Sequence, residues 1–221
     1  MKNLLKWWHA FDQLLFPNAP LCGLCAQNPS LAVGVCDVCL RSLSIDWKES
    51  LVFGRPCFSL VAYQGYVRDL IHRMKFQSGY DTAGSFGFLL GLAAREEPRL
   101  QHIDFLLPVP LHDNRLSKRG FNQASVLADN INRAWKKPIC SHMLRVRDTK
   151  PQSELSSGER KDNLLGAFDM LPGFDFKGKT CLIVDDVITS GHTFMVLANL
   201  VEQYGGIPMG LFVARTEARK E

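Results

Sequence analysis

Cys181-Leu-Ile-Val-Asp-Asp-Val-Ile-Thr-Ser-Gly-His-Thr193 is the segment from which the fold of this chain can be predicted. Its first four residues form a short apolar run, which is typical of a strand buried on both faces in a parallel sheet. Asp185 and Asp186 follow at the carboxyl end of that strand. The hydroxyl-rich turn at 189–193 then precedes the apolar pattern of a helix over 194–204. The segment therefore predicts a strand, an acidic strand end, a turn and a helix in succession.

The turn has the composition of a phosphate-binding loop. Backbone N–H groups and the positive end of the helix dipole meet at a helix N-terminus, where they attract phosphate. The neighbouring carboxylates suit the hydroxyls of a sugar or a hydrated Mg²⁺, so the row of groups indicates a ribose phosphate. The simpler alternative is a strand, turn and helix in which Ser and Thr only cap the helix. We assign catalysis to Asp185 and Asp186, and phosphate binding to Thr189, Ser190, Gly191, His192 and Thr193.

The composition is typical of a globular protein with one α/β domain and a small appendage. The chain has 221 residues, of which 46% are hydrophobic and 22% are charged. No apolar run approaches the roughly 20 residues that span a bilayer, and polar residues interrupt any signal-peptide core near the N-terminus. We therefore expect a cytoplasmic protein without a transmembrane segment. The net charge of +4 is too small to indicate nucleic-acid binding by itself.

Four of the seven cysteines form two Cys-x-x-Cys pairs near the N-terminus. Cys22 and Cys25 make the first pair, and Cys36 and Cys39 make the second. Two such knuckles supply the four thiolates of a structural zinc site, which leaves no open position for catalysis. In a reducing compartment a metal site is favoured over disulfides. A redox Cys-x-x-Cys motif is the competing interpretation, but no strand pattern of the thioredoxin kind precedes these pairs.

Three regions are predicted along the chain. Residues 1–20 carry apolar side chains three or four apart and form an amphipathic helix, which either packs on the protein or contacts a membrane or a partner. Residues 21–55 form a four-cysteine zinc ribbon. From 56 to 221 strand and helix patterns alternate, which indicates an α/β fold with an open parallel sheet flanked by helices. Further strands are expected at 58–63, 104–109 and 209–214, and helices at 67–76, 82–95 and 124–135.

Basic residues gather in two segments of the third region. Arg115, Lys118 and Arg119 follow the strand at 104–109, at the edge where open α/β sheets bind ligands. These residues either hold a pyrophosphate with forked guanidinium groups or form an ordinary exposed basic loop. Residues 145–161 are polar and basic, and we expect a loop followed by a short helix. That segment is a lid, a solvated crossover or the wall of a groove for a polyanion.

Two resemblances follow from these features. The segment 181–193 resembles the phosphoribosyl pyrophosphate (PRPP) motif of type I phosphoribosyltransferases. Nearly the whole chain resembles the ComF/GntX family, in which a four-cysteine knuckle, the block Arg119-Gly-Phe-Asn-Gln123 and the PRPP motif occur in this order. The other matching positions are Lys75-Phe76, Pro108 to Arg115, Gln152, Arg160 and Asn163.

The resemblance implies a type I phosphoribosyltransferase fold joined to a zinc ribbon, in a protein of natural competence that handles incoming single-stranded DNA. At matching positions Asp185 and Asp186 would face ribose and magnesium, residues 189–193 the 5′-phosphate, and Arg115 and Arg119 the pyrophosphate or a DNA backbone. The expected cofactors are structural zinc, and Mg²⁺ together with PRPP. The expected partners are single-stranded DNA, PRPP or a related ribose phosphate, and a competence helicase. The expected nucleic-acid contacts are Lys118, Arg147, Lys150 and Arg160.

Three classes of function remain open at this point. The first is a binding protein, whose basic residues contact DNA phosphates while Phe121, Trp135 or Tyr80 stacks on bases. The second is an active phosphoribosyltransferase that transfers the group from PRPP to an acceptor. The third is an adaptor that acts through the zinc segment and the N-terminal helix. Phosphoribosyltransferases select their acceptor base with a separate hood, and here only 215–221 follow the last strand. Either the zinc segment occupies the hood position or no hood is present, and no set of residues indicates a purine or a pyrimidine.

Overall fold

The computed structural model describes residues 20–31, 33–75, 79–148 and 166–216. The amphipathic helix predicted within residues 1–20 lies outside the described residues. So do five positions singled out in the sequence, namely Phe76, Lys150, Gln152, Arg160 and Asn163.

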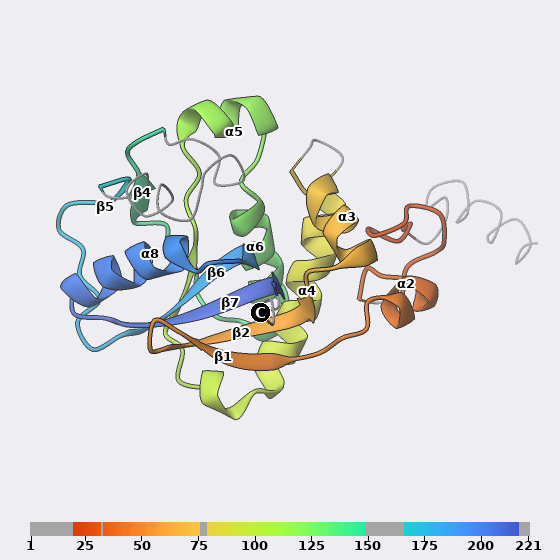
Figure 1. Ribbon diagram of the computed structural model, residues 1–221, viewed down its shortest axis with the longest axis horizontal. Coiled ribbons are helices and arrows are strands. Elements are labelled where there is room, and N and C mark those ends of the chain that lie inside the picture. Colours follow the sequence, from red (N-terminus) through yellow and green to blue (C-terminus); the bar gives the residue numbers. More distant parts are fainter. Residues whose placement is uncertain (1–19, 32, 76–78, 149–165, 217–221) are drawn as a thin grey trace, which may run out of the picture.

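A five-stranded sheet with the order β1-β2-β7-β6-β3 forms the centre of the described chain (Figure 1). β2 (Arg55–Ala62), β7 (Ile207–Arg215), β6 (Thr180–Ile188) and β3 (Phe105–Pro108) are parallel. β1 (Lys48–Val52) is an antiparallel edge strand paired with β2. The predicted α/β fold is thereby confirmed, with a mixed sheet that begins inside the range predicted for the zinc ribbon. β4 (Met143–Arg145) and β5 (Phe168–Met170) form a separate hairpin.

Helices cover both faces of the sheet (Figure 1). α4 (Tyr80–Glu96) and α6 (Gln123–Trp135) pack on one face, and α8 (His192–Gln203) packs on the other. α3 (Gly65–Arg73) follows β2, and a 3₁₀ turn at Pro98–Leu100 follows α4.

Along β6 the apolar side chains alternate between the two layers of the core. Leu182 and Val184 join the layer under α4 and α6, whereas Cys181 and Ile183 join the layer under α8. Each of these side chains is fully buried, and burying one of the larger ones contributes about 1.5–3 kcal/mol. β6 is therefore the strand buried on both faces that the sequence predicts.

β6 differs from the prediction in its length. It continues through the acidic pair to Ile188, because β7 runs beside it as far as the pair Ile188 and Arg215. The ladder between β3 and β6 ends earlier, at the pair Pro108 and Val184. The next residue, Val109, still donates its backbone N–H to the Val184 carbonyl at 3.0 Å, but no residue of β3 pairs with Asp185.

The basic segment after β3 contains a helix that the sequence analysis describes only as a loop. α5 (Asp113–Arg119) is capped by His112, whose Nδ1 accepts a hydrogen bond from the backbone N–H of Asn114 at 3.2 Å. The helix ends at Gly120, which has the left-handed φ of 83° that favours glycine. α5 has no buried residue, so it lacks the apolar periodicity by which helices are recognised.

The cysteine-containing segment 20–44 packs directly on α3 and α4. It includes α2 (Asp37–Ser42). The Oγ1 of Thr82 donates to the Gly23 carbonyl at 2.8 Å, and the Oγ of Ser85 donates to the Gly34 carbonyl at 3.0 Å. A Cβ at Gly23 would lie 2.6 Å from the Asp81 carbonyl oxygen, so this contact requires glycine. The described part of the segment is therefore joined closely to the domain.

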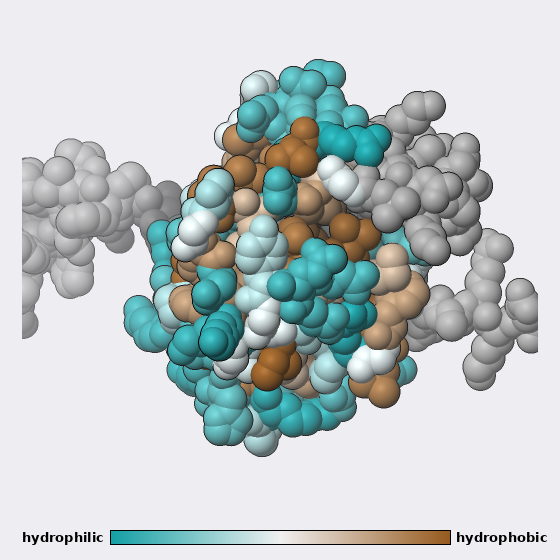
Figure 2. All heavy atoms as spheres, turned by 90° about the vertical axis from the view of Figure 1, so that its left-hand side faces the viewer, coloured by the Kyte–Doolittle hydropathy of each residue, from teal (hydrophilic) through white to brown (hydrophobic). Residues whose placement is uncertain are grey.

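The outer surface on the side of α8 is mainly hydrophilic. Figure 2 shows apolar residues there as small groups separated by hydrophilic ones. Among the residues with a described structure, none of the helices has the combination of length and apolar character that a membrane crossing demands.

Candidate functional site

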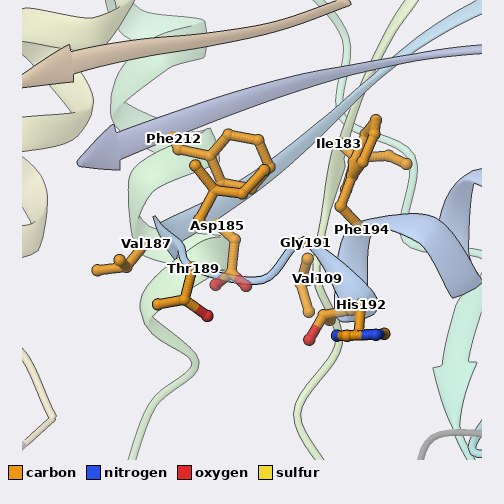
Figure 3. Close-up of a pocket in the computed structure, with 11 residues that line it drawn as sticks. Val109, Ile183, Asp185, Val187, Thr189, Gly191, His192, Phe194 and Phe212 are labelled. Atoms are coloured by element: carbon orange, nitrogen blue, oxygen red, sulfur yellow. The ribbon is translucent and has the colours of Figure 1, made fainter. Parts of the chain in front are cut away.

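A small hollow lies at the carboxyl end of β6 (Figure 3), and its outline encloses about 300 Å³, part of which is open solvent. Its walls are the end of β6, the turn before α8, Val109 after β3 and Phe212 on β7. Five residues predicted from the sequence line it, namely Asp185, Thr189, Gly191, His192 and Thr193. Asp186 and Ser190 are not among the lining residues. The hollow thus combines one of the two acids with most of the predicted phosphate loop.

Gly191 gives the turn at 189–193, the predicted phosphate loop, its shape. It is the N-cap of α8 and has a left-handed φ of 75°. A Cβ at this position would lie 2.5 Å from Cγ1 of Val52, at the tip of the β1–β2 hairpin. The loop is also held by a 2.7 Å hydrogen bond between the Ser190 hydroxyl and Nδ1 of His192. Because the first N–H groups of a helix have no acceptor inside the helix, the start of α8 is suited to binding an anion in this hollow.

Asp185 points into the hollow. In Figure 3 its carboxylate is directed toward the turn between Thr189 and Gly191. One carboxylate oxygen accepts the backbone N–H of Asp186 at 2.9 Å. Burial and, next, the adjacent Asp186 carboxylate raise the pKa of Asp185 to about 7. A cation or sugar hydroxyls near this carboxylate would favour its charged form.

The Asp186 side chain lies on the opposite face of β6 from that of Asp185. Successive side chains of a strand point to opposite faces, and the Asp186 carboxylate instead accepts the backbone N–H of Val187 at 2.7 Å. Its charge acts on Arg119, where it opposes the lowering of the guanidinium pKa by burial. The acidic pair therefore connects the hollow with the basic residues beside it.

Basic residues from three separate parts of the chain surround the acidic pair. The charge of Lys75, just after α3, lowers the pKa of Asp185, and so does the charge of Arg145 on β4. Burial, followed by the charge of Arg115, lowers the pKa of Arg145 to about 10. Arg119 is partly buried and lies close enough to Arg115 for the two charges to interact. Such a gathering of like charges favours a bound anion.

Lys75 and Arg145 lie close enough to Asp185 for their charges to act on it, but neither is among the ligands predicted from the sequence. Lys75 is a position that matches the ComF/GntX family and Arg145 begins the basic segment 145–161, yet neither pattern assigns the residue a contact. Arg145 lies across the ring of Phe168 on the neighbouring strand, with its guanidinium carbon 5.2 Å from the ring centroid. Their place beside Asp185 depends on the packing of distant elements.

Asp148 joins the end of the β4 segment to α5. Its carboxylate accepts a hydrogen bond from Nδ2 of Asn114 at 2.8 Å and lies 3.8 Å from Nε of Arg115. Lys118 and Arg147 are both exposed near this junction, and the Lys118 charge contributes to lowering the pKa of Asp148. The structure thus brings together two of the four predicted nucleic-acid contacts, and the other two lie outside the described residues.

The four paired cysteines converge on one point. The sulfur atoms of Cys22, Cys25, Cys36 and Cys39 all lie within 4.8 Å of one another, and those of Cys25 and Cys36 are 3.9 Å apart. A tetrahedral zinc site with Zn–S bonds of about 2.3 Å requires sulfur separations of about 3.8 Å. The cluster therefore has the ligands and the approximate size of a closed metal site.

The surroundings of the cluster shift the pKa values of its thiols in opposite directions. Backbone N–H groups of Asn28 and then Gln27 lower the pKa of Cys25 to about 6, whereas burial raises the pKa of Cys39 to about 12. The Tyr66 hydroxyl lies 3.5 Å from the Cys39 sulfur. Tyr66 is in the first turn of α3, so the domain supplies an outer contact to the cluster.

The aromatic residues considered for base stacking differ in their exposure. Trp135 is only 7% exposed and belongs to the core, so it does not serve as a stacking surface. Tyr80 is 52% exposed, and its ring makes an edge contact with Phe121 at a centroid distance of 5.6 Å.

Comparison with known proteins agrees with this geometry. Residues 116–220 match the family described as "Phosphoribosyl transferase domain", a range that contains both acids and the loop before α8. Competence protein F of Haemophilus influenzae is 30% identical over 191 residues, which cover 84% of this chain and 80% of that protein. DNA utilization protein YhgH of Escherichia coli K12 is 33% identical over 214 residues, and the match covers 84% of this chain and 92% of that protein. Competence protein ComFC of Bacillus subtilis is 26% identical over 213 residues and covers 90% and 84%.

Proposed function

Because this chain belongs to the ComF family of competence and DNA utilization proteins and has a phosphoribosyltransferase fold, we propose that it binds PRPP or a related ribose phosphate and handles single-stranded DNA in natural transformation. The observation that carries the ribose phosphate is the hollow in which Asp185 faces the start of α8. We place this activity in the cytoplasm, because the sequence pattern predicts neither a signal peptide nor a membrane-spanning run. A competence helicase is a further proposed partner, on the basis of the family resemblance.

In the proposed complex each group of the ligand has a separate set of residues. The 5′-phosphate binds the turn at 189–193, where helix N–H groups and hydroxyls donate hydrogen bonds. Asp185 accepts from the sugar hydroxyls. Arg115 and Arg119 hold the pyrophosphate, and Arg145 and Lys75 add positive charge. Mg²⁺, when bound with PRPP, neutralises pyrophosphate charge, and the carboxylates of the acidic pair are suitable oxygen ligands for it.

The proposed metal of the cysteine cluster is zinc in a structural role. Four thiolates close the coordination shell, so no position remains for a substrate. The hydrogen bonds from Thr82 and Ser85 hold the loops between the cysteines against α4. Zinc would thus fix a segment that packs on the domain.

For DNA we propose the exposed basic surface on α5 and after β4, which includes Lys118 and Arg147. Lys150 and Arg160 are proposed as further contacts. The interior of the hollow is less suitable for a polynucleotide, because the Asp185 carboxylate repels a phosphodiester at the position proposed for the sugar hydroxyls. We therefore expect ribose phosphate and DNA to bind independently.

Enzymatic transfer is the second candidate, and the orientation of Asp185 into the hollow favours it. Transfer from PRPP passes through a cationic sugar, which a nearby carboxylate stabilises. The test is release of pyrophosphate from PRPP and Mg²⁺ in the presence of a panel of bases. If no base supports release, the protein acts through binding alone.

One titration series tests the proposed binding function. PRPP with Mg²⁺ and a single-stranded oligonucleotide are titrated separately and then together into the same preparation. We expect Asp185→Asn combined with Asp186→Asn to abolish PRPP binding and to leave oligonucleotide affinity within about twofold of the parent. Absence of PRPP binding to the parent protein would refute the ribose phosphate site. Mutual displacement of the two ligands would refute the separate DNA surface.

A further inference from the structure

Gln123 is a buried polar residue that none of the proposed ligand contacts uses. Its side chain is 5% exposed and lies at the first position of α6. The amide nitrogen donates to the backbone carbonyl of Met74 at 3.1 Å, and the amide oxygen accepts from Nη1 of Arg119 at 3.1 Å. One side chain thereby connects the ends of α3, α5 and α6.

Each hydrogen bond of the Gln123 side chain leads to a positively charged residue of the proposed anion site, one through the backbone before Lys75 and one directly to Arg119. Met74 immediately precedes Lys75, whose charge acts on Asp185. Arg119 itself interacts with the charges of Asp186 and Asp185. Two positive charges that act on the acidic pair are therefore connected to the same amide.

The support beneath Gln123 is itself fixed. The preceding residue, Asn122, donates from Nδ2 to the Val109 carbonyl at 3.0 Å, and its Oδ1 accepts from the backbone N–H of Ala124 at 3.1 Å. Val109 lines the hollow. The start of α6 is thus anchored to the wall of the site, and the Gln123 amide projects from that anchor.

Gln is the residue type that suits this position. Its amide supplies a donor for the Met74 carbonyl and an acceptor for the Arg119 guanidinium at once. A Glu carboxylate would keep the acceptor and lose the donor, and Met would lose both. Hydrogen bonds to charged groups are among the stronger ones in proteins, so loss of the Gln123 acceptor should weaken the hold on the Arg119 guanidinium.

We propose that Gln123 is a positioning residue, which holds Lys75 and Arg119 at the spacing that binds the pyrophosphate group of PRPP. The proposal rests on the proposed function of the hollow. The two parts of the ligand can be told apart, because the Gln123 side chain hydrogen-bonds to Arg119 and to the Met74 carbonyl within the described residues, and not to the turn at 189–193. Its loss should therefore affect PRPP and spare a ligand that lacks pyrophosphate.

The test compares PRPP with ribose 5-phosphate, both with Mg²⁺, in calorimetric titrations of the full chain. We expect Gln123→Met to weaken PRPP binding about tenfold, which corresponds to about 1.4 kcal/mol, and to change ribose 5-phosphate binding less than twofold. The matched control is Gln101→Met, since Gln101 also donates from a side-chain amide to backbone carbonyls, at Arg95 and Glu97. The control should change neither affinity.

A second background tests whether Gln123 acts through Arg119. When Arg119 is already replaced in Arg119→Ala, adding Gln123→Met should lower PRPP affinity by clearly less than in the parent. If Gln123→Met does not fold, Gln123→Glu provides the same comparison, because its carboxylate neutralises Arg119 and cannot donate to Met74.

The outcomes are distinct from those of the proposed function. A parent protein that binds neither PRPP nor ribose 5-phosphate refutes the function itself. A parent that binds both, with Gln123→Met retaining full PRPP affinity, overturns the role of Gln123 alone. Equal losses for both ligands also overturn it, since they indicate general damage to the hollow.

Discussion

Replacing Gly191 by alanine should destabilise the protein and weaken ligand binding through one local collision. The residue has a φ of 75°, and an L-residue in the left-handed region costs roughly 1–2 kcal/mol. The new Cβ would also lie 2.5 Å from Cγ1 of Val52 and 3.3 Å from Cε2 of Phe53. Overpacking of this kind costs about 1–3 kcal/mol. The two contributions together predict a loss of roughly 2–5 kcal/mol in the free energy of unfolding.

The lower half of that range is expected, because the colliding side chains have room to move. Val52 ends the edge strand β1, and Phe53 is 50% exposed. Movement of the hairpin away from the loop would relieve the contact. It would also remove the support of the phosphate loop, so PRPP affinity should fall together with stability.

Gly173→Ala is the matched control for this prediction. Gly173 has a similar φ of 81°, but a Cβ there would have no heavy atom within 4 Å. It should show the backbone strain alone, roughly 1–2 kcal/mol. Denaturant unfolding measures both variants, and the comparison is valid if the slope m is unchanged.

The contact with Val52 is tested separately in a double-mutant cycle. Val52→Ala makes room beside position 191, so it should recover part of the stability lost in Gly191→Ala. If Gly191→Ala is no more destabilising than Gly173→Ala, or Val52→Ala recovers nothing, the hairpin does not pack against the phosphate loop and the reasoning is refuted.

Three further predictions concern charge and metal. Because the pKa of Asp185 is raised to about 7, the folded protein is most stable where this carboxyl is protonated: the contribution is complete below pH about 4 and is lost as the pH rises to about 7. Asp185→Asn removes the buried charge, so it should raise the melting temperature more at pH 8 than at pH 5. Equal shifts at the two pH values would contradict the raised pKa. The purified chain should contain one zinc ion by elemental analysis, and Cys39→Ala should lose the metal and melt at a lower temperature. Lys118→Ala and Arg147→Ala should each reduce the salt slope of single-strand affinity by about 0.7, and unchanged slopes would exclude them from the DNA surface.

The parts of the fold that could be predicted are those with a local signal. The burial of β6 on both faces follows from four consecutive apolar residues, and the start of α6 follows from Asn122, whose side chain caps Ala124. Likewise Gly191 marks the turn before α8 because its backbone conformation suits glycine. In each case the residues that determine the structure are close together in the sequence.

The remaining features depend on contacts between distant residues. β6 extends past its apolar run only because β7 continues beside it, which the sequence of β6 does not reveal. Arg145 and Asp185 are separated by a long stretch of chain, so no spacing rule relates them. The sequence pattern places Asp185 and Asp186 together at a strand end. Because pairing with β7 extends the strand through both residues, their side chains instead point to opposite faces.

No residue of the cysteine-containing segment 20–44 lines the hollow. The segment nevertheless affects the surroundings of the hollow, because it contacts α3, the helix that leads to Lys75. At its first turn Tyr66 reaches the sulfur of Cys39, and at its last turn Arg73 donates to the carbonyl of Leu24. The chain then continues directly to Met74, which Gln123 holds, and to Lys75. Because both ends of α3 contact the cysteine-containing segment, the order of that segment also affects where Lys75 lies relative to the acidic pair. The cysteine-containing segment and the surroundings of the hollow are therefore parts of one packed structure.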